Sequence, residues 1–124
     1  MTINKVLLTV LVGLSISLST IALEVGDQAP NFTLEATDGK TYTLEQFHNK
    51  QAIVIAWYPR AFTSGCTIEC KSLAKNGHLL KALDVTYFMA SVDPLETNKE
   101  FAAENEADFP LLSDPSKKVA AAYD

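Results

Sequence analysis

Two cysteines, Cys66 and Cys70, are the residues of this sequence best suited to chemistry. An apolar run at 53–57 leads toward Cys66, and a pattern typical of a helix follows it. A thiol at a helix N-terminus meets free N–H groups and partial positive charge, and both favour the nucleophilic thiolate. The stretch therefore predicts redox or acyl-transfer chemistry at the Cys66 sulfur.

The spacing of the two cysteines argues against a purely structural disulfide. Positions i and i+4 of a helix hold their Cβ atoms about 5–6 Å apart, whereas a disulfide needs about 3.8 Å. A Cys66–Cys70 bond would distort a turn of helix and close a loop too short to stabilise the fold much. Such a bond would serve better as a redox switch than as a structural link.

Turn signals and hydrophobic patterning indicate the elements that must position Cys66. Asp38-Gly39 predicts a hairpin between strands at 32–35 and 40–43. The strands expected after it are 53–57, 85–92 and 109–112, and the expected helices are 65–83, one running to 107 and one starting at Asp114. This order predicts an α/β fold with a mostly parallel sheet, in which 53–57 is a central strand. Cys66 would lie just beyond its carboxyl end, where such sheets place their chemistry.

The start of the second helix carries its own signal. Asp93, Pro94 and Glu96 have the residue types and spacing of an N-cap, a first helical position and a third helical position.

The N-terminal residues predict a targeting segment. Lys5 precedes an uncharged run at 6–23, and small residues near Ala22 are typical of a signal peptide at 1–22. An uncleaved membrane anchor formed by 6–23 is the alternative, since that run is just long enough to span a bilayer. Both interpretations predict an exported protein, periplasmic or extracytoplasmic, with a single domain at 23–124. The net charge of −5 and a single arginine argue against a nucleic-acid partner.

Pro59, Thr63 and Cys66 form a Pro-x-x-x-Thr-x-x-Cys pattern. With three further segments it makes the sequence resemble the peroxiredoxins across 24–124. These segments are Gly26-Asp27-x-Ala29-Pro30-x-Phe32, Asp38-Gly39-x-x-Tyr42-x-Leu44 and Ser113-Asp114-Pro115. Gly65-Cys66-Thr67-x-Glu69 is similar to the bacterioferritin-comigratory, or PrxQ-type, branch. The resemblance implies a thioredoxin-like fold, three-layer α/β/α with an N-terminal β-hairpin, and neither a cofactor nor a metal.

The resemblance also implies a thiol peroxidase that reduces hydrogen peroxide and organic hydroperoxides. Cys66 would be the peroxidatic thiolate that becomes a sulfenic acid. Thr63 would supply a hydroxyl that accepts one hydrogen bond and donates to the attacked oxygen. Pro59 would shield the thiolate from water, and Gly65 would leave backbone N–H groups free to stabilise the peroxide. A thioredoxin-like donor would recycle the enzyme, as a monomer or a dimer.

Cys70 departs from the pattern of this branch, in which the resolving cysteine comes five residues after the peroxidatic one. Cys70 comes four residues after Cys66. It could still resolve the sulfenic acid if the first helical turn unwinds. In the alternative, a single-cysteine mechanism, Cys70 is a small buried apolar residue. Glu69 either braces the loop or lies on a solvated helix face.

The arginine that the family carries late in the chain is a second departure. Arg60 lies inside the Pro-to-Cys loop, at a variable position of the motif, and cannot take that role. The family also has further strands and a helix after a segment like 117–124. We therefore expect a C-terminally truncated chain with those strands and that helix missing, a sheet that lacks strands on one side of 53–57, and weak or no activity.

Two other functions compete with a peroxidase. An exported Cys-x-x-x-Cys domain also resembles the copper chaperones of cytochrome oxidase assembly, with His48 and His78 as available ligands. Lys71 stands where those chaperones usually have proline, which weakens this alternative. A thioredoxin-like thiol-disulfide oxidoreductase normally has Cys-x-x-Cys, which this sequence lacks.

Overall fold

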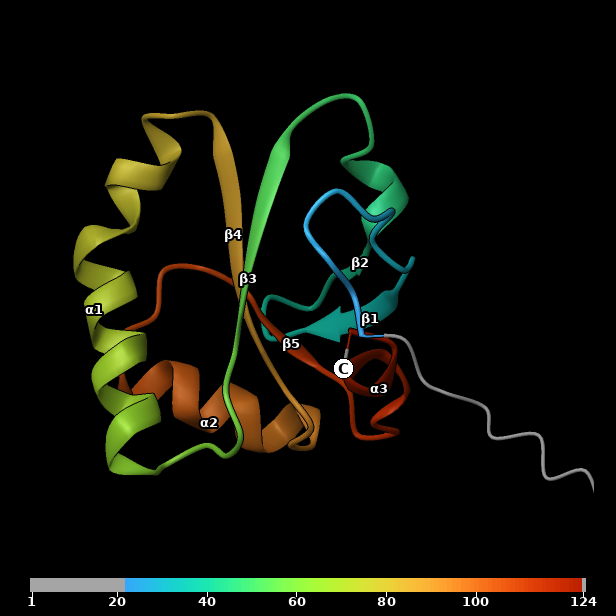
Figure 1. Cartoon of the computed structure of the whole chain (residues 1–124). Helices are drawn as coiled ribbons and strands as arrows, with labels where there is room; N and C mark the ends of the chain where they lie inside the picture. Colours follow the sequence, from blue (N-terminus) through green and yellow to red (C-terminus); the bar gives the residue numbers. More distant parts are fainter. Residues whose placement is uncertain (1–21, 124) are drawn as a thin grey trace, which may run out of the picture.

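The computed structural model describes residues 22–123, so the predicted signal segment at 1–22 lies almost wholly outside the described residues. A hairpin comes first, and strands then alternate with helices, as the sequence predicts (Figure 1). The elements are β1 (Thr33–Ala36), β2 (Thr41–Thr43), the 3₁₀ helix η1 (Leu44–Gln46), β3 (Ala52–Trp57), α1 (Ser64–Lys81), β4 (Val85–Ser91), α2 (Leu95–Glu104), β5 (Leu111–Ser113) and α3 (Lys118–Tyr123). Between residues 22 and 123, none of these helices is both long and apolar enough to cross a membrane.

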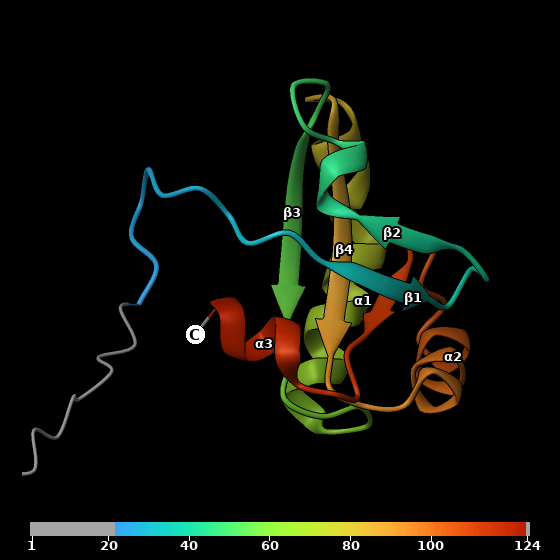
Figure 2. The ribbon, with the colours of Figure 1, turned by 90° about the vertical axis from the view of Figure 1, so that its right-hand side faces the viewer.

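The strands form one sheet in the order β2-β1-β5-β4-β3. Strands β3, β4 and β5 are parallel, whereas β1 is antiparallel to both β2 and β5. The prediction of a mostly parallel sheet holds for the three core strands, and the hairpin makes the sheet mixed. The carboxyl ends of β3 and β4 therefore lie at one end of the sheet, where the loop leading to α1 begins (Figure 2).

Apolar side chains cover both faces of the sheet. Along β4, Tyr87 and Met89 pack in a cluster with residues of α1 and α2. The alternating residues Phe88 and Ala90 pack in a second cluster with residues of the hairpin, η1 and α3. Because successive side chains of a strand point to opposite faces, β4 is buried on both sides. The layers in Figure 1 confirm the expected three-layer α/β/α arrangement of a thioredoxin-like fold.

Strand β3 is not central, and this corrects the sequence-based expectation. Among the described residues it pairs with β4 alone and lies at the edge of the sheet (Figure 2). Val54, in its middle, is 41% exposed. An apolar run indicates burial of the two faces of a strand, but it carries no information about whether both neighbouring strands are present. The expectation that the sheet lacks strands on one side of 53–57 agrees with this topology.

The start of α2 differs from the prediction in its capping residue. Pro94 is the N-cap and Leu95 the first helical residue, so Asp93 lies one position before the cap. The helix ends at Glu104 rather than 107. The Asp93 carboxylate instead accepts a hydrogen bond from the Ala61 N–H at 2.8 Å, across the turn between β3 and α1. A donor brought near by the tertiary fold has displaced the local capping bond that the sequence indicates.

The last helix begins later than Asp114, where the sequence predicts it. Asp114 is buried, and its Oδ2 atom accepts from the Ala120 N–H at 2.8 Å. Its Oδ1 atom accepts from the Ser116 hydroxyl at 2.9 Å. The Asp114 carboxylate thus satisfies a backbone donor in the first turn of α3 from outside the helix. Residues 115–116, between Asp114 and α3, form a turn.

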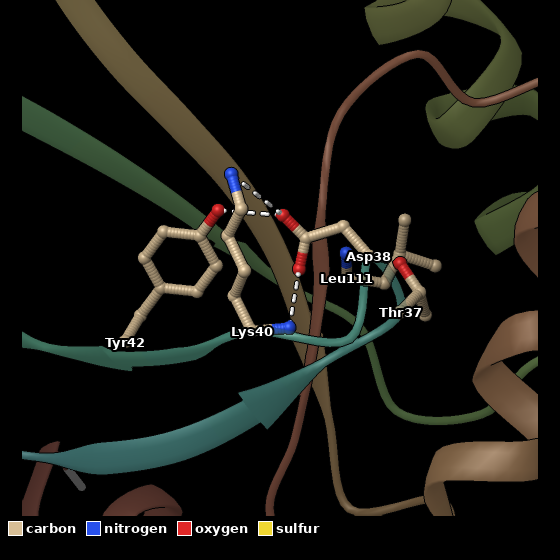
Figure 3. A network of polar contacts seen from close by, with 5 residues as sticks. All are labelled: Thr37, Asp38, Lys40, Tyr42 and Leu111. Carbon is tan, nitrogen blue, oxygen red and sulfur yellow. Dashed lines mark hydrogen bonds and ion pairs between the residues drawn. The ribbon is translucent and has the colours of Figure 1, made fainter.

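Polar contacts stabilise the turn of the hairpin, and one of them joins it to β5 (Figure 3). Asp38 accepts from the Tyr42 hydroxyl at 2.7 Å and from the Lys40 N–H at 3.1 Å. Burial, followed by the Asp38 carboxylate, raises the pKa of Tyr42 to about 12. The Thr37 hydroxyl accepts from the Leu111 N–H at 3.1 Å and so connects the turn to β5. Gly39 has a φ of +80°, as the predicted hairpin turn requires.

Candidate active site

Cys66 lies where the sequence predicts, in the first turn of α1 beyond the carboxyl end of β3. The helix begins at Ser64, and Thr63 is its N-cap with an extended backbone (φ −83°, ψ 153°). The Thr63 carbonyl accepts the first helical bond, from the Thr67 N–H at 2.9 Å. Cys66 is therefore the third helical residue, on a strand-to-helix turn at the end of the parallel strands.

The loop at 58–63 that precedes the helix is held in an unusual conformation. Phe62 has a φ of +63°, in the left-handed region. For a residue that is not glycine this conformation costs about 1–2 kcal/mol, so surrounding contacts must hold it. The Phe62 ring packs edge-on against Phe101 of α2, with a centroid distance of 5.3 Å. Directly before Phe62 in the chain, the Ala61 N–H donates to the Asp93 carboxylate.

Thr63 and Pro59 are both exposed on this loop. The Thr63 hydroxyl donates to the Arg60 carbonyl at 3.0 Å, so its proton is committed to the loop. Donation to a substrate oxygen would require that this contact is released. Pro59 lines a cavity of about 440 Å³. Its other lining residues come from the end of β3, the segment after β4 and helix α3, and they are Trp57, Tyr58, Val92, Ala120 and Tyr123.

Gly65 precedes Cys66 and has open space around it. A Cβ atom built at Gly65 would meet no heavy atom within 4 Å. The packing of this chain therefore does not require a glycine there. The open space leaves the backbone of the first turn accessible to a small molecule, which is what a peroxide site needs.

The two thiols are free and buried in the same apolar cluster. Cys66 is 5% exposed and Cys70 0% exposed, and Tyr58 and Phe101 belong to the cluster around them. Burial, followed by the charge of Glu69, raises the pKa of the Cys70 thiol to about 11, with Lys71 opposing the shift. Cys70 is thus a neutral thiol at physiological pH and a poor nucleophile in this conformation.

Sequence patterns gave no indication of the polar network that lies beneath the cysteine turn. The hydroxyls of Tyr58 and Ser91 donate to Asn98 Oδ1 at 2.6 and 3.1 Å. The Asn98 amide donates to the Leu112 carbonyl at 3.4 Å. Burial raises the pKa of Tyr58 well above its ordinary value, and the Asp93 charge adds to the shift. The only available signal was a polar residue, Asn98, inside an amphipathic helix, and such residues usually face solvent.

The other candidate residues lie apart from this site or on its surface. Arg60 and Glu69 are exposed, and so are His48 and His78. His78 Nδ1 lies 3.2 Å from the Lys75 carbonyl of its own helix. Across residues 22–123, no group of three or more His, Cys, Asp or Glu side chains is arranged to hold a metal ion. The histidines that the copper alternative would need are not gathered around the cysteines.

A family model described as the AhpC/TSA family matches residues 25–124. The chain belongs to the AhpC/TSA family. The sequence-based resemblance to peroxiredoxins is therefore confirmed, and the match includes the whole of the Pro59-to-Cys66 pattern.

Two curated relatives of this chain share the name Peroxiredoxin Bcp. The chain is 36% identical to Peroxiredoxin Bcp of Escherichia coli over 97 residues, which are 78% of this chain and 62% of the relative. It is 31% identical to Peroxiredoxin Bcp of Bacillus subtilis over 104 residues, which are 84% of this chain and 66% of the relative. The chain thus spans slightly less than two thirds of the length of these relatives.

Solved structures agree with the AhpC/TSA assignment. Peroxidoxin BcpB of Mycobacterium tuberculosis superposes with a TM-score of 0.74 at 30% identity, covering 79% of this chain and 64% of that one. Peroxiredoxin Q of Xanthomonas campestris superposes with a TM-score of 0.70 at 26% identity, covering 74% of this chain and 58% of that one. Both structures carry names of the predicted bacterioferritin-comigratory, or PrxQ-type, branch.

Proposed function

We propose that this protein is a thiol peroxidase in which Cys66 attacks a hydroperoxide. The proposal rests on one observation: in an AhpC/TSA chain, Cys66 occupies the first turn of α1, directly after the loop that carries Pro59 and Thr63. The Cys66 thiolate attacks the terminal peroxide oxygen, the O–O bond breaks, and the remaining alkoxide or hydroxide leaves as an alcohol or water after taking a proton. Cys66 is left as a sulfenic acid.

Hydrogen peroxide and organic hydroperoxides are the proposed substrates. The bacterioferritin comigratory protein of Xanthomonas campestris, 25% identical to this chain, has alkyl peroxide reduction activity. In this chain, open space beside Gly65 and the cavity lined by Trp57 and Pro59 lie around the same loop. Both features are compatible with a substrate larger than hydrogen peroxide.

Cys70 is proposed to resolve the sulfenic acid, and a thioredoxin-like donor to reduce the resulting disulfide. Because Cys70 is fully buried and its pKa is raised to about 11, resolution requires the first turns of α1 to open. We also propose that residues 1–22 export the protein, so that the donor is extracytoplasmic. Fractionation of cells that express the full chain tests the export.

A single-turnover experiment tests the peroxidase. The reduced protein is mixed with one equivalent of hydrogen peroxide or cumene hydroperoxide, and the product is trapped with a sulfenic-acid reagent and weighed by mass spectrometry. The wild type should lose two hydrogens as the disulfide forms, and Cys70→Ser should accumulate a sulfenic acid. Cys66→Ser should remain unmodified. Equal oxidation of Cys66→Ser and the wild type would refute the proposal.

A further inference from the structure

A single long-range hydrogen bond joins the loop before α1 to the turn after β4. Its donor is the backbone N–H of Ala61 and its acceptor is Asp93 Oδ2, at 2.8 Å and 32 residues apart in the sequence. Ala61 is buried, and Asp93 is partly buried. A charged acceptor on a backbone donor in such a place makes a strong bond. We call this bond the Asp93 tether.

Asp93 is itself held in place, so the tether has a fixed end. Its N–H donates to the Ser91 hydroxyl at 3.1 Å, and its carbonyl accepts from the Ser113 hydroxyl. Ser91 in turn donates to the buried Asn98. The carboxylate is therefore presented from the ends of β4 and β5, the rigid part of the sheet, toward a loop that has little regular structure of its own.

The loop end of the tether is under strain. Ala61 directly precedes Phe62, whose left-handed backbone is unfavourable for a phenylalanine. The contact of Thr63 with the Arg60 carbonyl is local and lies within the loop. Tyr58, at the start of the loop, is bonded to the Ala90 carbonyl of β4 and to Asn98. Without the bond to Asp93, the part of the loop next to Phe62 would lose its own polar anchor and could relax toward an ordinary backbone conformation.

We propose that Asp93 is a positioning residue, and that its bond to Ala61 controls the balance between two states of the cysteine turn. With the tether formed, the first turn of α1 is intact and Cys66 is presented for reaction. With the tether broken, the turn can unwind and Cys66 can reach Cys70. This inference rests on the proposed function of Cys66 and adds to it a residue outside the Pro-to-Cys pattern.

The chemistry of disulfide formation makes this release necessary. The Cys70 thiol attacks the sulfur of the Cys66 sulfenic acid, an S–S bond forms, and the S–OH bond breaks to release water. At helical spacing the two Cβ atoms lie about 5–6 Å apart and must approach to about 3.8 Å. Since both thiols lie in one helix, the approach must come from unwinding at its free N-terminal end.

Two variants and a matched control test the tether without using peroxide. Asp93→Ala removes the acceptor, and Asp93→Asn keeps an oxygen acceptor without the charge. Glu96→Gln is the control, because it changes a nearby exposed carboxylate whose ion pair is with Lys99, at 2.7 Å. Each protein is equilibrated with reduced and oxidised dithiothreitol, and the disulfide fraction is measured after acid quenching and alkylation.

The tether should disfavour the disulfide, since only the reduced form contains it. We expect Asp93→Ala to shift the equilibrium toward the Cys66–Cys70 disulfide by about tenfold, because the reduced form loses one charge-assisted hydrogen bond. Asp93→Asn should lie between the alanine variant and the wild type, and Glu96→Gln should match the wild type. An unchanged equilibrium in Asp93→Ala overturns the inference, and so does a wild type that forms no such disulfide.

Amide hydrogen exchange keeps the inference testable if Asp93→Ala does not fold. In the reduced wild type the Ala61 amide should be protected, and in Asp93→Asn it should exchange severalfold faster while the Gly77 amide does not change. Equal exchange at Ala61 in both proteins overturns the inference. If hydrogen peroxide fails to oxidise Cys66 in the wild type, the proposed function fails, whereas the dithiothreitol and exchange measurements still decide the role of Asp93.

Discussion

Helix α1 is held by different kinds of contact at its two ends. In its C-terminal half, a Cβ atom on Gly77 would overlap the Tyr87 hydroxyl, so the helix backbone rests directly on β4. The Tyr87 ring packs against Phe109 with centroids 5.3 Å apart, and Lys81 Nζ lies 5.6 Å from the Tyr87 ring centre. At the other end, Gly65 has open space around it, and a strained loop leads into the helix.

This difference in packing divides α1 into a C-terminal half that stays attached to the sheet and a first turn that can unwind. Close packing transmits strain and cannot be released one contact at a time. The segment at 61–63, directly before the helix, is anchored by one long-range hydrogen bond and one aromatic contact, which can be released at a cost of a few kcal/mol. The cysteine turn lies at the releasable end, and Cys66 must leave its buried apolar cluster when the turn unwinds. A redox cycle that unwinds one turn is therefore compatible with a helix that stays attached to the sheet.

The two glycines of α1 give the largest test of this comparison. Gly77→Ala should lower the free energy of unfolding by about 2–3 kcal/mol, because the new methyl group overlaps the Tyr87 ring. Gly65→Ala is the matched control, and its stability should stay within about 1 kcal/mol of the wild type. Urea unfolding followed by circular dichroism measures both. Similar losses for the two variants would show that the ends are equally packed.

The pH dependence of Cys70 tests how well the cluster beneath the helix excludes water. In Cys66→Ser, alkylation of Cys70 by iodoacetamide should reach half its limiting rate near pH 11, compared with about 9.0 in the urea-unfolded chain. The folded pKa is raised, so the neutral thiol stabilises the fold fully below pH 9. That contribution disappears as the pH rises from 9 to about 11. A folded-state midpoint near 9 would mean that Cys70 is open to solvent.

Two buried tyrosines offer a smaller and more selective test. Tyr58→Phe should lower the free energy of unfolding by about 1–2 kcal/mol, since it leaves Asn98 Oδ1 without its 2.6 Å donor. Tyr87→Phe should be neutral or stabilising by up to about 1 kcal/mol, because within residues 22–123 the Tyr87 hydroxyl has no hydrogen-bond partner. Thermal and urea unfolding measure both. A loss above about 1 kcal/mol in Tyr87→Phe would indicate that the hydroxyl is bonded.

Among the substitutions expected to destabilise the protein, Phe62→Ala should give the smallest and most local effect. Phe62→Ala removes the contact with Phe101 from a side chain that is already 47% exposed, so the loss should be about 1 kcal/mol. Amide exchange should increase at 61–67 and remain unchanged near Gly77. Leu79→Ala, an exposed position on the same helix, is the control. Faster exchange along the whole helix would contradict the separation of its two ends.

The amino-acid sequence was sufficient to predict the cysteine turn and the order of elements. Cys66, Pro59 and Thr63 lie on one short segment, and local spacing is preserved whatever the rest of the chain does. The apolar run before them and the helical pattern after them predicted a strand-to-helix turn, and the structure has one between Trp57 and Ser64. Local periodicity and turn signals carry this kind of information directly.

Predictions that depended on partners distant in the sequence were less successful. Asp93 has the sequence features of a helix cap, yet its carboxylate binds the Ala61 N–H. The run at 53–57 looked like a central strand, yet β3 is at the edge of the described sheet. Asn98 carried no usable signal, although it is buried and joins β4 and β5 to Tyr58, the residue that follows β3. For Asp93 and Asn98 the deciding contacts lie 32 and 40 residues away, and the edge position of β3 depends on which strands pair with it.

The family, the α/β order and the place of Cys66 could all be inferred from the sequence, because motif spacing and hydrophobic period are properties of neighbouring residues. How that cysteine is held depends instead on the packing of distant segments. Folding brings Asp93 to Ala61, places Tyr87 beneath Gly77, and encloses Cys70 in a cluster that raises its pKa. Burial and long-range hydrogen bonds arise only when such segments pack together, so they set which end of α1 is fixed and which end can open.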